Sequence, residues 1–338
     1  RGRGGGRRPY PPPPPEPPPP PILPDNCTYQ GEVRQGAAGG AAGALRGFRA
    51  LTEAKPDDLA AWEGLRASAE VVGDTLTLAL ASAQLGASCR DPARGAAFWE
   101  QAGLLLGPHP DGAADAAIAF ERAFALDPRR GVAFDKYFRR VRAANEDDKL
   151  LEIIAKRLEV ADQEAEIAKM FWEQARVLRK KGDVDGALAA LENVTMLEPD
   201  HIGALALSGE IYITRGAFAQ AAPLLATLSQ SGEAPAQQRL VSGVAAADLF
   251  EKRLGQPERA LEVLLGLHRE GLSTLPVRER LASLAARTGA YDEATTLLEH
   301  IMTERDTRAG RIEAARLAMA LYRDRLERPA DAKAAVTQ

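Results

Sequence analysis

The sequence has few of the residues that build active sites or covalent cross-links. It has two cysteines, Cys27 and Cys89, and four histidines in 338 residues, so neither a disulfide framework nor a Cys/His zinc site is expected. It has no Gly-x-Ser-x-Gly turn, no HExxH motif and no Walker loop. The glycine-rich stretch 36–43 lacks the following Lys-Ser or Lys-Thr pair of a phosphate loop. We therefore predict no catalytic residue, no cofactor, no metal and no small-molecule substrate.

Aromatic residues, long apolar runs and a dominant sign of charge are also missing. Aromatics make up 5% of the chain and the formal net charge is −4, which gives no general attraction to nucleic acid. No apolar run approaches the roughly 20 residues of a membrane span. The sequence starts without an initiator methionine, so we expect a fragment or processed product whose targeting signal is missing. The cytoplasm is then the default compartment, and the oligomeric state is not predicted.

Residues 1–39 differ in composition from everything that follows. Four arginines and several glycines precede a long proline run, and Gly and Ala dominate the rest. Proline fixes φ and removes a backbone donor, which favours extended polyproline II over a helix or a central strand. We predict a disordered Arg/Gly- and Pro-rich tail or linker that ends at residue 39.

From residue 40 onward, apolar residues recur at helical spacing. The stretch 171–199 indicates two short antiparallel helices, separated at Gly182 and ended before Pro199. One such hairpin cannot bury its own apolar face, so further copies are expected.

Copies are present throughout the chain. The five residues Phe-Trp-Glu-Gln-Ala occur at 98–102 and again at 171–175, and a pattern at 249–260 recurs 72 residues later. One small or apolar residue marks the early part of each predicted second helix. Successive marks lie 34 or 37–39 residues apart, in alternation: Ala44, Leu78, Ala116, Leu150, Ala187, Ala221, Ala260, Ala294 and Ala332.

A 34-residue helical hairpin with these anchors resembles the tetratricopeptide repeat family. One repeat matches the family pattern at Leu205, Ser208, Gly209, Tyr212, Gly216, Phe218, Ala221, Leu225 and Leu228. The resemblance implies an all-α fold, a right-handed superhelical solenoid of antiparallel helix hairpins over residues 40–338, with about eight repeats. A soft joint is predicted at 229–238, and longer connections at 86–95, 107–112 and 159–170.

The resemblance also implies a binding groove lined by the first helices. Two tryptophans and six basic residues take groove positions in our alignment: Trp99, Arg139, Arg142, Lys169, Trp172, Arg176, Arg179 and Lys180. Such a groove favours an acidic peptide or a free C-terminus. No Asn occupies the positions of the family's carboxylate clamp, so that clamp is not predicted. In the opposing interpretation, the alignment of the repeats is wrong by one residue. Both tryptophans then pack in the core, and the basic residues lie on a solvent-exposed face.

We therefore expect a non-catalytic scaffold that binds a protein or peptide. Two alternatives stay open. One is nucleic-acid binding through residues 132–181 and the Arg/Gly arm, which the overall acidity disfavours. The other is the regulatory array of an enzyme whose catalytic domain lies outside this sequence. The Ala-, Arg- and Gly-rich composition is typical of a GC-rich bacterial source.

Overall fold

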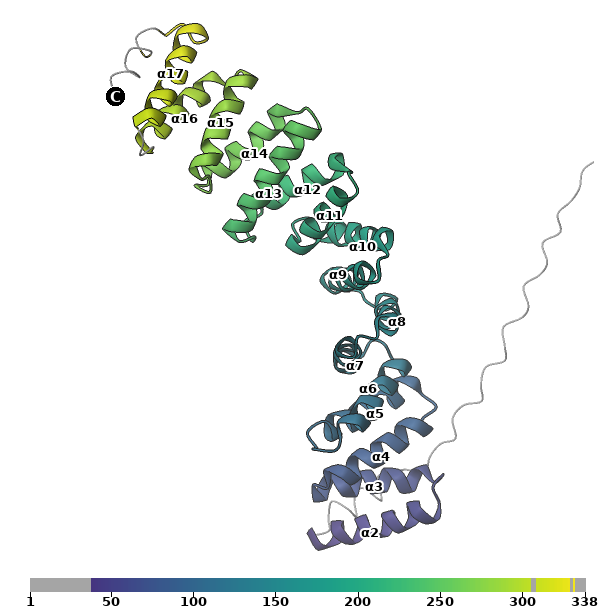
Figure 1. Ribbon diagram of the computed structural model, residues 1–338. Helices are drawn as coiled ribbons and strands as arrows, with labels where there is room; N and C mark the ends of the chain where they lie inside the picture. Colours follow the sequence, from purple (N-terminus) through teal and green to yellow (C-terminus); the bar gives the residue numbers. More distant parts are fainter. Residues whose placement is uncertain (1–37, 305–307, 329–330, 332–338) are drawn as a thin grey trace, which may run out of the picture. The chain divides into compact units, whose positions relative to one another are not determined.

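The computed structural model describes residues 38–304, 308–328 and 331, and every regular element in this part of the chain is a helix (Figure 1). None of these helices combines the length and apolar character that a membrane crossing requires. The predictions for residues 1–37 and for Ala332 lie outside the described residues. The chain divides into two compact units, Arg1–Tyr137 and Phe138–Gln338.

Unit 1 is a stack of antiparallel helices in chain order. Its helices are α2 (Ala38–Ala54), α3 (Leu59–Val72), α4 (Thr75–Ser88), α5 (Pro92–Leu106), α6 (Ala113–Leu126) and the first half of α7 (Gly131–Ala143). Aspartates set several helix starts: the side chains of Asp58, Asp74 and Asp91 accept backbone N–H groups of the first turn. Each helix from α2 to α6 packs against the next.

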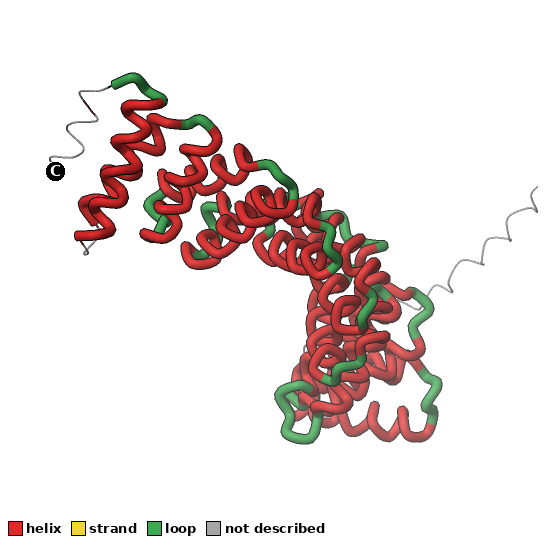
Figure 2. The backbone as a smooth tube through the Cα atoms, turned by 45° about the horizontal axis from the view of Figure 1, so that its top comes forward, coloured by secondary structure: helices red, strands yellow, loops and turns green. Residues whose placement is uncertain are grey.

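Unit 2 continues the hairpins after the second half of α7. Its helices are α8 (Asp147–Leu158), α9 (Glu164–Lys181), α10 (Val184–Leu197), α11 (Ile202–Thr214), α12 (Phe218–Gln230), α13 (Ala236–Asp248) with the π-helical turn η1 (Leu249–Arg253), α14 (Pro257–Arg269), α15 (Leu275–Thr288), α16 (Tyr291–Glu304) and α17 (Arg308–Asp324). Short loops join them (Figure 2).

The predicted repeat register is confirmed by the second helices. From α4 to α16 the marked residue is the fourth residue of its helix. Each is at most 8% exposed, and four are completely buried: Ala187, Ala221, Ala260 and Ala294. The complete burial of these four alanines indicates that the neighbouring helices approach closely at these points. The all-α hairpin fold predicted from the sequence is therefore correct.

The repeat at α11 and α12 shows why its anchors have these residue types. Leu205, Leu225 and Leu228 are buried. A Cβ atom on Gly209 would lie 2.9 Å from the Leu225 side chain, so the close packing of the two helices requires glycine. Gly216 has φ +71, a left-handed conformation that favours glycine.

The 72-residue repeat noted in the sequence extends to individual backbone hydrogen bonds. Leu254 N–H donates to the Leu249 carbonyl at 3.0 Å, and Leu326 N–H donates to the Leu321 carbonyl at 3.0 Å. Farther along, Gln256 N–H donates to Phe250 O and Arg328 N–H to Tyr322 O, both at 2.8 Å. Both segments thus end their helices in the same way.

Two predicted connections are wrong. The charged connection 159–170 is too long, because α9 already begins at Glu164, and Ala168 and Met170 within the predicted connection are buried helical residues. The connection 86–95 shrinks to residues 89–91, because Pro92 opens α5 at a position that suits proline. Between α12 and α13 the linker is 231–235 with Ala234 buried, and its softness stays a prediction.

Candidate functional site

Helix α9 presents four of the predicted groove residues on one face. Trp172, Arg176, Arg179 and Lys180 are spaced by four, three and one residues, which places them along one side of a helix. Ala168, Ala175 and Val177 of the same helix are buried. The face is therefore fixed by the packing of α9.

The next first helix, α11, supplies the second wall. Gly203, Ala206, Leu207 and Glu210 face the four residues of α9, and together the eight line an open groove of about 470 Å³. Gly203, Ala206 and Glu210 are spaced by three and four residues, so they lie along one side of α11. Small side chains on this helix leave the space that the groove occupies.

Trp172 is the largest side chain in the groove and is half-buried. A Cβ atom on Gly203 would lie 2.8 Å from the indole ring, so the ring rests directly on the α11 backbone. The His201 ring lies 5.0 Å away, centroid to centroid, and the Arg176 guanidinium 5.9 Å from the indole centroid. One part of the indole is thus packed while another part lines the groove.

The cations of the groove are mostly paired within the chain. The Arg179 guanidinium lies 3.1 Å from the Glu210 carboxylate, and Lys180 Nζ lies 2.8 Å from Asp147. Arg142 of α7 and Arg176 share one carboxylate, that of Glu173, at 3.1 and 3.4 Å. Four cations therefore face three carboxylates, and the single excess positive charge lies at Glu173.

The remaining predicted residues lie elsewhere. Trp99 belongs to unit 1, where its indole packs within 2.8 Å of where a Cβ on Gly86 would be. Arg139 and Lys169 are exposed and have no ion-pair partner among the described residues. None of these three lines the groove between α9 and α11.

Sequence reasoning missed Glu173, which organises the charge of the site. Its residue is 9% exposed. A signal was present: Glu100 takes the same place in the repeated Phe-Trp-Glu-Gln-Ala segment, is equally buried, and accepts hydrogen bonds from Arg130 and the Ala133 N–H. A carboxylate at this repeat position ties one first helix to a neighbouring one.

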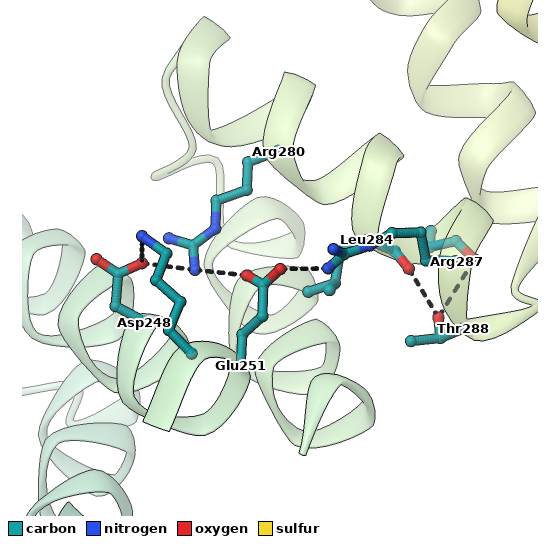
Figure 3. Close-up of polar contacts among 8 residues, drawn as sticks. Asp248, Glu251, Arg280, Leu284, Arg287 and Thr288 are labelled. Carbon is teal, nitrogen blue, oxygen red and sulfur yellow. Dashed lines mark hydrogen bonds and ion pairs between the residues drawn. The ribbon is translucent and has the colours of Figure 1, made fainter. Parts of the chain in front are cut away.

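A second charged cluster lies where η1 meets α15. Figure 3 shows Arg280 between Asp248 and Glu251, with Arg287 on the far side of the Glu251 carboxylate. The Arg280 guanidinium is 2.7 Å from Asp248 and 2.9 Å from Glu251. Burial favours the neutral form of Glu251, but hydrogen bonds from Arg280 and Arg287 outweigh it and hold its pKa below the ordinary value. These ion pairs link the repeat that contains η1 to the repeat that contains α15.

Among the described residues no three His, Cys, Asp or Glu side chains lie close enough together to hold a metal ion.

Fold and groove together define an all-α helical-repeat protein, a class whose extended surfaces serve protein interaction. The tetratricopeptide repeat family matches residues 178–243, from the end of α9 into α13. This match confirms the tetratricopeptide resemblance in the part of the chain that contains most of the groove. A comparison with curated proteins by sequence gives no match.

Several solved structures are similar to this chain. A tetratricopeptide repeat protein from Parabacteroides merdae is 12% identical, with 81% of this chain and 99% of that chain covered and a TM-score of 0.35. The Cut9–Hcn1 hetero-tetramer of APC/C is 15% identical, with 82% and 52% covered and a TM-score of 0.31. Yeast Tom70 is 16% identical, with 84% and 59% covered and a TM-score of 0.30. The chain spans about half the length of the Cut9–Hcn1 chain that it matches, and these likenesses support no statement about partners.

Proposed function

We propose that this protein is a scaffold that binds a peptide segment of a protein partner in the groove between α9 and α11. The observation that carries this proposal is the groove itself, about 470 Å³ with Trp172 in one wall and small or apolar residues in the other. Four of its eight lining residues, Trp172, Arg176, Arg179 and Lys180, are among those that the sequence predicts for a binding groove.

The groove suits an apolar or aromatic side chain of the peptide. Trp172 and Leu207 supply apolar surface, and Gly203 and Ala206 leave room beside them. Tryptophan is enriched among residues that dominate binding energy, because a large rigid ring buries much area for little loss of conformational freedom. We infer that a peptide side chain packs against the free part of the indole.

The charge distribution favours a peptide with a carboxylate near that side chain. Arg179 and Lys180 already have carboxylate partners, so their main effect is to shape the groove. Arg176 shares Glu173 with Arg142 and is about half exposed, with 45% of its side chain open to solvent. A carboxylate on the peptide would therefore give the Arg176 guanidinium a further partner, through a charge-assisted hydrogen bond.

Selection of random displayed peptides on the immobilised full chain would test the proposal. We expect selected peptides to combine an apolar or aromatic residue with Asp, Glu or a free C-terminus. In fluorescence anisotropy, Trp172→Ala and Arg176→Ala should each weaken a selected peptide by about tenfold or more.

The chain offers matched controls for both variants. Trp99→Ala removes the tryptophan at the equivalent repeat position in unit 1, and Lys169→Ala removes an exposed cation from the same helix. Both should leave affinity unchanged. Equal affinity of all four variants and the parent would place the site elsewhere.

The nucleic-acid alternative stays untested and has less support. Several cations of 132–181, among them Lys180 and Arg142, are paired with carboxylates and are less available to phosphates. Binding that falls steeply with added salt would favour nucleic acid instead.

A further inference from the structure

Helix α4 of unit 1 has no charged residue in its 14 residues, TLTLALASAQLGAS. Most of its surface is covered by α3 and α5, yet Leu76 and Leu80 are 51% and 58% exposed. These two leucines are one helical turn apart and so lie on the same outward face. A helix that is apolar on every side is normally covered on every side.

Comparison with the equivalent position in other second helices shows that an exposed leucine at Leu76 is unusual. Two residues before the marked position, three of the other second helices carry an acid that pairs with a cation of the following repeat: Asp148 with Lys181, Asp185 with Arg215 and Asp292 with Arg328. An acid in the first turn also interacts favourably with the helix dipole. In α4 an exposed leucine replaces this favourable arrangement.

The neighbouring second helix α6 extends the apolar surface. Ile118 of α6, at the repeat position of Leu80, is 49% exposed. Arg49 of α2 reaches Asp74 before α4 at 3.3 Å, and Thr75 of α4 lies 3.4 Å from His109 in the turn before α6. The ends of the three helices thus lie near one another, and we call the surface of α2, α4 and α6 around Leu76, Leu80 and Ile118 the outer face of unit 1.

The outer face has the dimensions of a protein interface. Helices of 14 residues, such as α4 and α6, are about 21 Å long, and packed helices lie roughly 10 Å apart. Three of them make a face of about 20 by 30 Å. The area of this face, about 600 Å², approaches the roughly 800 Å² per partner that a standard interface buries.

Charges at the two edges of this face match each other. On α2, Arg46 precedes Glu53 by seven residues; on α6, Asp115 precedes Arg122 by seven. All four are exposed, and none takes part in an ion pair among the described residues. From its start to its end, α2 therefore carries a positive and then a negative charge. Helix α6 carries a negative and then a positive charge.

We infer that the outer face of unit 1 binds the same face of a second copy of this chain. In this dimer a two-fold axis runs parallel to α4, in the plane between the two copies. Leu76 and Leu80 of one copy then contact the same leucines of the second copy. Helix α2 of each copy lies over α6 of the other, and the two helices run parallel. Arg46 then faces the second copy's Asp115, and Glu53 faces its Arg122. The interface is closed by symmetry, because the same patch serves both copies.

Sedimentation equilibrium of the full chain tests this inference. We expect a dimer, and we expect the double variant Leu76→Glu/Leu80→Glu to raise its dissociation constant roughly a hundredfold or more. Val241→Glu is the control, because Val241 is 57% exposed on α13 of unit 2. It should not change the dissociation constant. Circular dichroism should show the parent helicity for both, since all three side chains are already exposed.

Charge reversal tests the geometry of the pairing. Arg46→Glu and Asp115→Arg should each weaken the dimer by about tenfold, and the two together should restore it. A monomeric parent chain, with the face covered by residues 1–37 or by another protein, would overturn the inference. So would a dimer that the glutamates leave intact, or a charge pair that shows no restoration. Loss of peptide binding by the Trp172 variant would leave this result unaffected.

Discussion

Single buried alanines set the spacing of the helices. Ala187 and Ala221 are completely buried where neighbouring helices meet. Replacing either with leucine adds three carbon atoms where no space exists, and should lower the free energy of unfolding by roughly 1–3 kcal/mol. Thermal melting followed by circular dichroism measures this change in stability.

Ala189→Leu is the control, because Ala189 is exposed on the same helix α10. The melting midpoint of this variant should stay near that of the parent. An unchanged midpoint in the Ala187 and Ala221 variants would refute the packing argument.

His268 is the titratable residue whose protonation should affect folding at mildly acidic pH. Burial, together with the charges of Arg278 and His300, lowers its pKa below the ordinary 6.5, with Glu304 opposing. Its Nδ1 lies 2.8 Å from the buried Ser273 hydroxyl. The folded chain binds this proton less readily than the unfolded chain, so the stabilisation is complete above pH 6.5 and is lost as the pH falls through the lowered pKa.

Urea denaturation from about pH 8 to about pH 5 would measure this effect. The free energy of unfolding of the parent should fall with pH more steeply than that of His268→Gln. Parallel curves for the two proteins would show that His268 does not contribute.

At the scale of elements, the turn η1 holds two repeats together through Glu251. Its carboxylate accepts hydrogen bonds from both Arg280 and Arg287. Glu251→Gln leaves the Arg287 guanidinium without its charged partner and leaves Arg280 with Asp248 alone. Because Arg287 is more than half exposed, water replaces part of the loss, and we expect roughly 1–2 kcal/mol of destabilisation in urea. Lys252→Gln should cost far less, since Lys252 is 64% exposed. An equal effect of the two substitutions would contradict the role of Glu251.

Helix packing was readable from the sequence to a much greater extent than charge pairing. The marked positions from Leu78 to Ala294 were predictable because a buried residue at a fixed place in every repeat leaves a periodic trace. The alignment to the tetratricopeptide pattern likewise selected Trp172, Arg176, Arg179 and Lys180, which line one groove in the structure. The partners of these cations were not predictable, because Glu210 and Asp147 lie 31 and 33 residues away and their contact depends on how whole helices stack. The start of α9 was missed because its exposed charges resemble those of a loop.

At the scale of the whole molecule, the repeating unit is a pair of hairpins. The backbone hydrogen bonds that end α13 with η1 recur 72 residues later at the end of α17. Loss or duplication of one such stretch would join equivalent ends and create no new kind of contact between helices. Gene segments of this length could thus be gained or lost in one recombination event without a folding penalty at the junction. Natural relatives of different length should then differ by steps of about two hairpins, and an engineered chain should be extended in the same steps.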